Sequence, residues 1–65
     1  MRIDLNGAPV ETDAPTLAAL IEERGHDAAS VASALNGAFV PRTRRAATPL
    51  SHGARVELLT PMQGG

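Results

Sequence analysis

The sequence predicts an α+β domain, a mixed sheet of about four or five strands with one helix packed on one face. Stretches near both ends of the chain alternate between apolar and polar residues, which is the period of a half-buried strand. Two Asn-Gly pairs mark tight hairpin turns. One short stretch between those turns has the apolar spacing of a helix.

The chain opens with a predicted β-hairpin. Residues 1–5 place apolar side chains at alternate positions, so one face of this strand is buried. Asn6-Gly7 fits a type I′ turn, because both central residues of that turn need positive φ. Residues 8–12 form the returning strand, and Pro9 places it at an edge of the sheet, since proline has no N–H for a second ladder.

A short helix follows the hairpin. Thr16 is the predicted N-cap, because its hydroxyl can accept from an unpaired N–H of the first turn. Leu17, Leu20 and Ile21 form one apolar stripe, and Gly25 is the predicted stop. A helix of about nine residues does not persist alone in water, so it must pack on the sheet.

The second half of the chain predicts three further strands. Residues 31–35 and 38–40 flank the Asn-Gly turn at 36–37, and the last strand covers 55–60 with alternate residues facing inward. Residues 42–51 are expected to be irregular. The first and last strands are expected to be parallel neighbours in the middle of the sheet.

The predicted domain spans residues 1–60, and a flexible tail covers 61–65. Pro61 cannot continue a central ladder, so the strand should end before it. Fully extended, the tail reaches roughly 17 Å. Gly64 and Gly65 leave the terminal carboxylate free of neighbouring side chains, and that group is ionised at neutral pH. The tail therefore predicts a carboxylate that enters a narrow site on another protein.

Composition excludes several functional classes. The net charge of −1 and the single aromatic residue argue against a nucleic-acid partner. No apolar run is long enough for a membrane span or has the form of a signal peptide, so a cytoplasmic protein is expected. The chain has no cysteine. Its two histidines, His26 and His52, are expected to be exposed, and we predict no metal site.

Two residues are candidates for partner docking. Leu59 is expected to point outward because its neighbours in the last strand alternate inward, and an exposed apolar residue beside a functional tail is a reasonable interface anchor. Arg42 is expected to face an acidic partner surface. Together with Arg44 and Arg45 it forms a basic cluster, which is expected to be a solvated face.

The segment 31–42, Val-Ala-Ser-Ala-Leu-Asn-Gly-Ala-Phe-Val-Pro-Arg, closely resembles the centre of the ThiS family, the sulfur carriers of thiamine biosynthesis. The opening hairpin, the helix at 16–21 and the Pro-Met-Gln-Gly-Gly ending at 61–65 fit the same family, so the resemblance covers the whole chain. Two positions depart from it. Ala54 stands where aspartate is expected, and Ser33 replaces a β-branched residue, which is expected to weaken the core slightly.

This resemblance implies a ubiquitin-like β-grasp fold without catalytic residues or a bound cofactor of its own. A ThiF-like adenylyltransferase uses ATP and Mg²⁺ to adenylate the terminal carboxylate, and a persulfide donor then converts it to a thiocarboxylate. A ThiG-like thiazole synthase accepts that sulfur. By resemblance Gly65 carries the adenylate and the thiocarboxylate, while Gly64, Gln63 and Met62 enter the partner's active site.

Three alternatives stay open from the sequence. A small subunit of molybdopterin synthase resembles this fold and ending. A ubiquitin-like modifier joined to target lysines shares the diglycine. In a third alternative, the chain is a β-grasp binding module whose diglycine is incidental.

Overall fold

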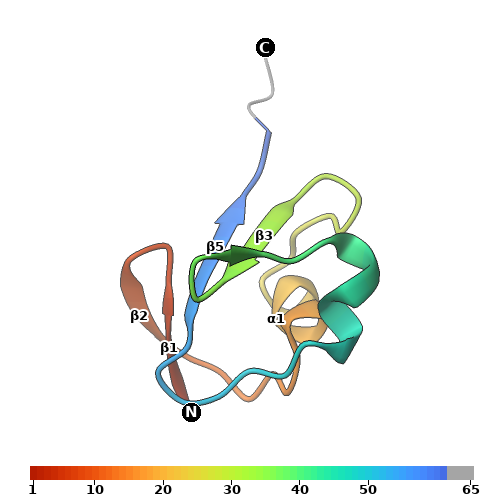
Figure 1. The fold of residues 1–65 in the computed structure, drawn as a ribbon. Coiled ribbons are helices and arrows are strands. Elements are labelled where there is room, and N and C mark those ends of the chain that lie inside the picture. Colours follow the sequence, from red (N-terminus) through yellow and green to blue (C-terminus); the bar gives the residue numbers. More distant parts are fainter. Residues whose placement is uncertain (62–65) are drawn as a thin grey trace.

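A computed structural model describes residues 1–61 of the chain. Five strands form a single sheet in the order β2-β1-β5-β3-β4, and the helices lie on one side of it (Figure 1). The elements, in chain order, are β1 (Arg2–Leu5), β2 (Ala8–Glu11), α1 (Leu17–Glu23), β3 (Ala32–Leu35), β4 (Ala38–Phe39), the 3₁₀ helix η1 (Arg42–Ala47) and β5 (Arg55–Leu59). β1 and β5 are parallel and the other neighbours are antiparallel. This mixed sheet confirms the predicted β-grasp architecture, with the first and last strands side by side.

Both Asn-Gly turns form where they were predicted. Asn6 and Asn36 each have a φ of 51°, and each is followed by a glycine with a φ of 84° or 86°. The side chains of both asparagines also form hydrogen bonds to β5, the central strand. The Oδ1 of Asn6 accepts from the N–H of Leu58 at 2.9 Å, and the Oδ1 of Asn36 accepts from the N–H of Arg55 at 2.9 Å. The two turns therefore lie beside β5 and hold it from both sides.

The helix α1 begins at the predicted cap. The hydroxyl of Thr16 accepts from the N–H of Ala19 at 3.2 Å. The helix has seven residues, fewer than the nine expected, and its apolar stripe is buried against the sheet. The core lies between α1, η1 and the inner face of the sheet, and its most deeply buried large side chains are Ile3, Leu17, Leu20, Ile21 and Val56.

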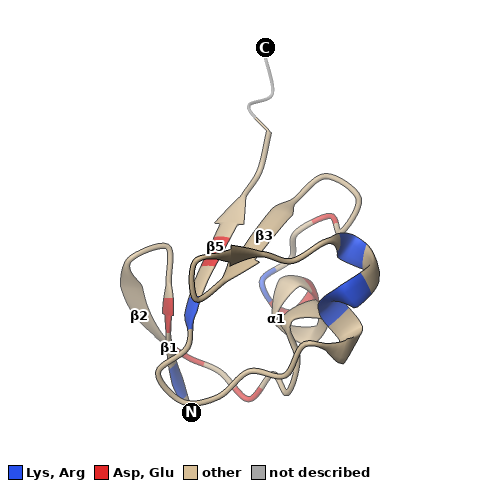
Figure 2. Ribbon diagram, in the orientation of Figure 1, with Lys and Arg blue, Asp and Glu red and all other residues tan. Residues whose placement is uncertain are grey.

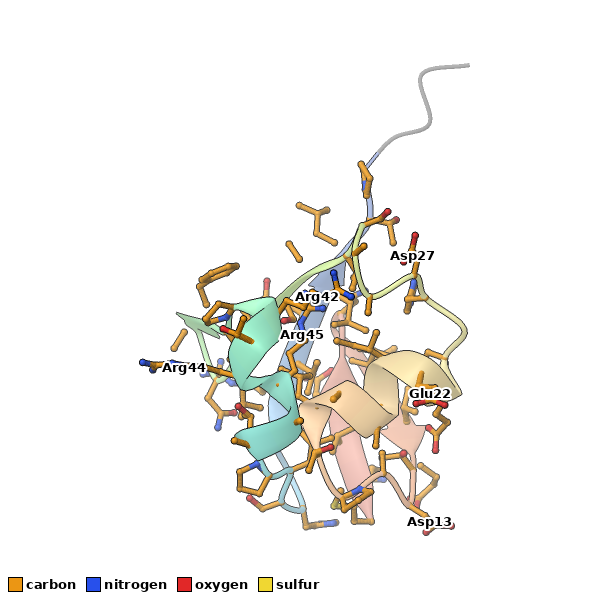
Figure 3. The ribbon with its side chains drawn as sticks, turned by 90° about the vertical axis from the view of Figure 1, so that its right-hand side faces the viewer. Asp13, Glu22, Asp27, Arg42, Arg44 and Arg45 are labelled. Atoms are coloured by element: carbon orange, nitrogen blue, oxygen red, sulfur yellow. The ribbon has the colours of Figure 1, made fainter. Side chains whose placement is uncertain are left out.

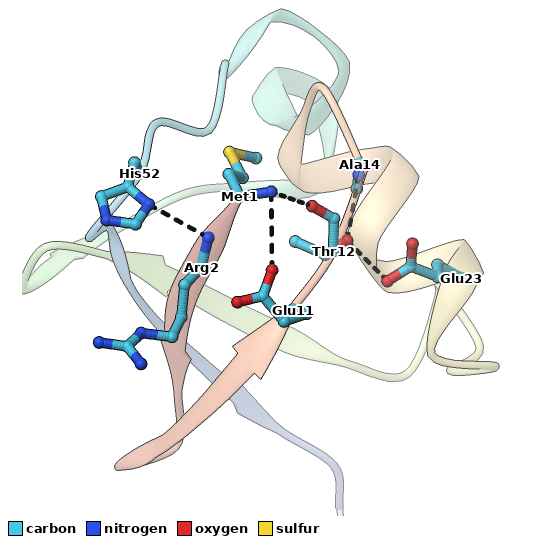
Figure 4. A network of polar contacts seen from close by, with 7 residues as sticks. All are labelled: Met1, Arg2, Glu11, Thr12, Ala14, Glu23 and His52. Atoms are coloured by element: carbon cyan, nitrogen blue, oxygen red, sulfur yellow. Dashed lines mark hydrogen bonds and ion pairs between the residues drawn. The ribbon is translucent and has the colours of Figure 1, made fainter.

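A polar network ties the first hairpin to the helix (Figure 4). The buried hydroxyl of Thr12 donates to Glu23 Oε2 at 2.7 Å and accepts from the N–H of Ala14 at 3.0 Å. The N-terminal amine donates to the carbonyl of Thr12 at 3.0 Å and lies 3.9 Å from Glu11 Oε2. These bonds satisfy backbone groups at the turn from β2 into α1 and connect the hairpin to the helix.

One segment differs from the prediction. Residues expected to be irregular between β4 and β5 include η1, which begins directly after Pro41. Proline has a fixed φ and suits the position before a helix. In the described part of the chain, neither helix has the length and apolar character to cross a bilayer.

Candidate docking surface and tail

The tail leaves from the middle of the sheet. β5 is the central strand, it ends at Leu59, and exposed Thr60 and Pro61 follow it (Figure 1). The predicted working residues Met62, Gln63, Gly64 and Gly65 lie outside the described residues, so their roles stay predictions.

One face of the sheet is open. Along β5 the side chains alternate, with Val56 and Leu58 buried under the helices and Arg55, Glu57 and Leu59 exposed on the other side. The predicted inward and outward positions of this strand are confirmed. We call the uncovered side the open face.

An apolar patch lies on the open face next to the start of the tail. Phe39 and Leu59 are the large apolar side chains exposed within residues 1–61, at 71% and 72%. Ala32 lies opposite Leu59 in the β3–β5 ladder, and Ala34 lies opposite Phe39 in the β3–β4 ladder. These four residues, here called the apolar patch, line a shallow hollow of about 200 Å³ together with Ser33 and Glu57.

The sequence analysis identified Leu59 but missed Phe39. The sequence held a weak signal, because successive residues of the predicted strand 38–40 face opposite sides, so Phe39 and Val40 cannot both point into the core. The structure buries Val40. The short β4 gave too few residues for that alternation to be recognised as a pattern.

Arg42 lies elsewhere on the molecule. It is exposed at the start of η1, where it lines a small hollow beside Ala18 and Ile21 of α1. Figure 2 shows the basic residues of η1 at the helical side of the molecule. The structure therefore does not bring Arg42 together with Leu59 on one surface, and its predicted contact with an acidic partner stays a prediction.

The predicted solvated face of three arginines is wrong for Arg45, which is only 4% exposed. Its Nε donates to Ser33 Oγ at 2.8 Å, its Nη1 donates to the carbonyl of Ala28 at 2.9 Å, and its Nη2 donates to the carbonyl of Val31. Figure 3 shows Arg44 pointing away from this group. A 3₁₀ helix has three residues per turn, so neighbouring residues face different sides.

Ser33 is buried in the core, and its hydroxyl makes hydrogen bonds there. Its hydroxyl is buried, accepts from Arg45 and donates to the carbonyl of Val40 at 2.9 Å. The serine hydroxyl therefore joins η1, β3 and the residue after β4, a contact that no β-branched hydrocarbon side chain can make.

The described residues do not form a site that could hold a metal ion. Within residues 1–61 no three His, Cys, Asp or Glu side chains lie close enough to hold an ion. His52 is exposed, and its Nδ1 accepts from the N–H of Arg2 at 3.2 Å. His26 is half-buried rather than exposed.

Comparisons with known proteins agree with the fold. The model of the ThiS family matches residues 3–65. A crystal structure of a thiamine biosynthesis protein, ThiS, from Geobacter metallireducens is 32% identical over 100% of both chains, with a TM-score of 0.81. A solution structure of a thiamine biosynthesis protein from the same organism is 30% identical over 100% of this chain and 88% of the other, with a TM-score of 0.85. No curated protein matches this sequence. The match to the family model over nearly the whole chain, together with the full-length structural likeness, shows that this chain belongs to the ThiS family.

Proposed function

We propose that the chain is a sulfur carrier of thiamine biosynthesis, and that Gly65 carries the sulfur as a thiocarboxylate. The family match and the two thiamine-biosynthesis relatives support the pathway. The exposed apolar patch beside the end of β5 is the observation that supports docking of a partner protein there. A partner that binds there lies next to the start of the tail.

The chemistry needs a partner enzyme. A carboxylate is a poor electrophile, because its leaving group would be oxide. Attack of the Gly65 carboxylate on the α-phosphorus of ATP releases pyrophosphate and leaves an acyl-adenylate. A persulfide sulfur then attacks the acyl carbon, AMP leaves, and reduction of the resulting acyl disulfide by a thiol gives the thiocarboxylate. The sequence has no Gly-rich phosphate loop, so an adenylyltransferase must supply the site for ATP and Mg²⁺.

The tail and the patch have separate tasks in this proposal. Met62, Gln63 and Gly64 lead the carboxylate into the partner's active site, where the absence of side chains on the last two residues gives clearance. The apolar patch supplies affinity, because large apolar side chains near the centre of an interface contribute most of its binding energy. The same surface serves the adenylyltransferase and then a thiazole synthase in turn.

Intact mass spectrometry tests the proposal. The chain is incubated with its adenylyltransferase, ATP, Mg²⁺ and a persulfide donor. We expect an AMP adduct on Gly65 when sulfur is omitted and an exchange of one oxygen for sulfur when it is present. The loaded chain should then support thiazole formation by the synthase. Conjugation to lysines of other proteins, or sulfur transfer only to a molybdopterin precursor, would contradict the proposal.

Replacing Leu59 with aspartate tests the docking role. Leu59 is 72% exposed, so Leu59→Asp should leave the melting temperature nearly unchanged, while partner affinity falls by about tenfold or more. Ala8→Asp introduces the same charge at an exposed edge position on β2 and is the matched control. Titration calorimetry with the adenylyltransferase measures both. Equal affinity of Leu59→Asp and the wild type would remove the apolar patch from the interface.

A further inference from the structure

A second hollow lies on the open face. It has a volume of about 500 Å³ and is bounded by the glycines of the two hairpin turns. Its charged lining comes from Asp4 of β1 and from Arg55 and Glu57 of β5, and Asn6 contributes an amide. We call this hollow, defined by these four residues, the acidic groove.

Within residues 1–61, neither carboxylate of the acidic groove forms an ion pair. Asp4 Oδ1 is buried and has no hydrogen-bond partner within residues 1–61. Asp4 lies opposite Arg55 in the parallel ladder, yet neither Asp4 nor Glu57 is within ion-pair distance of a cation in the described part of the chain. An oxygen this buried is closed to a docking side chain, so the groove attracts a partner through the negative charge of Asp4 and of exposed Glu57 rather than through a bond to Asp4 Oδ1.

The acidic groove continues into the apolar patch. Glu57 lines both hollows, and it lies opposite Ala34 in the β3–β5 ladder, which in turn lies opposite Phe39. The open face therefore changes along β5 from apolar beside the tail to charged between the hairpin turns. A partner that covers the apolar patch also comes close to the unpaired carboxylates.

We infer that the acidic groove receives a lysine or arginine side chain of the protein that docks on the apolar patch. This inference rests on the proposed function. The carboxylates of Asp4 and Glu57 and the guanidinium of Arg55 give the groove a net charge of −1. A cationic side chain brings N–H donors for exposed Glu57 and is attracted by the charge of Asp4, whereas an acidic side chain there would be repelled by two carboxylates. The aliphatic part of a lysine or arginine also suits a site that borders apolar surface.

Affinity measurements on matched variants test the inference. Asp4→Asn, Glu57→Gln and the double variant are titrated with the adenylyltransferase at low and at high salt. We expect about tenfold weaker binding for the double variant at low salt and a smaller loss at high salt, because salt screens the lost attraction. Asp13→Asn and Glu22→Gln remove the same charge at exposed positions near α1 and should bind like the wild type. Arg55→Gln removes the competing cation and should tighten binding.

Folding and the proposed function are checked separately. Thermal melting of each variant monitors the fold, and Asp4→Asn should melt no lower than the wild type, because its Oδ1 makes no bond to lose. Wild-type affinity in the double variant, with Leu59→Asp still weak, would overturn the groove inference alone. Loss of adenylation in the wild type itself would overturn the proposed function instead.

Discussion

Removing Gly64 and Gly65 should reduce formation of the thiocarboxylate by at least about a hundredfold, because a misplaced reacting group loses its alignment. The deletion moves the terminal carboxylate back by about 7 Å. The new end is Gln63, whose side chain stands beside the carboxylate. Mass spectrometry of the reaction with the adenylyltransferase, ATP and the persulfide donor measures the loss.

The fold should survive this deletion. Within residues 1–61, the buried apolar residues of the core lie between Ile3 and Leu58, so the truncated chain keeps them. Gly64→Ala and Gly64→Leu form a graded pair of controls, in which the larger side chain should slow adenylation more. Normal sulfur transfer by the truncated chain, or by a chain amidated at Gly65, would show that the carboxylate is not the working group.

Replacing Arg45 should have the largest effect on stability. Arg45→Ala leaves Ser33 Oγ and the carbonyls of Ala28 and Val31 without their donor and opens a space in the core. We expect a loss of about 3 kcal/mol in the free energy of unfolding, since hydrogen bonds from a charged donor are among the stronger ones. In a domain of this size the melting temperature then falls by roughly 12–24 °C.

Arg44→Ala is the matched control for Arg45. Arg44 is exposed on the same 3₁₀ helix, so its removal should change the free energy of unfolding by no more than about 0.5 kcal/mol. Ser33→Ala should cost about 1–2 kcal/mol, and the double variant Ser33→Ala with Arg45→Ala should cost less than the sum of the two. The free energies of unfolding are measured by urea denaturation. If the loss in the double variant equals the sum of the two single losses, the bond between these side chains does not contribute to stability.

Much of the fold could be predicted because its signals are local. The turn at Asn6 needs positive φ at two adjacent residues, and Asn-Gly satisfies this whatever the rest of the chain does. The cap at Thr16 and the alternation in β5 are likewise properties of a few consecutive residues. The parallel pairing of the first and last strands was predicted from the order of the elements, and the resemblance to the ThiS family implied the β-grasp fold. Local patterns do not by themselves fix which strands pair.

The arrangement of the open face depends on strand pairing, which local sequence patterns do not predict. Leu59 was predicted to be exposed from the alternation in its own strand, and this was correct. That it lies in one patch with Phe39 depends on β3, which pairs with both strands. The acidic groove likewise depends on the parallel pairing of β1 and β5, which brings Asp4 beside residues about fifty positions away.

By itself the sequence determined the strands, the capped helix and both turns. Only the tertiary structure decided which charges are buried. Arg45 stands in a run of arginines that resembles a solvated face, yet it meets carbonyls from the loop before β3 and a serine within it. A buried cation is tolerated only where several acceptors converge, and that convergence arises from chain segments that are distant in sequence.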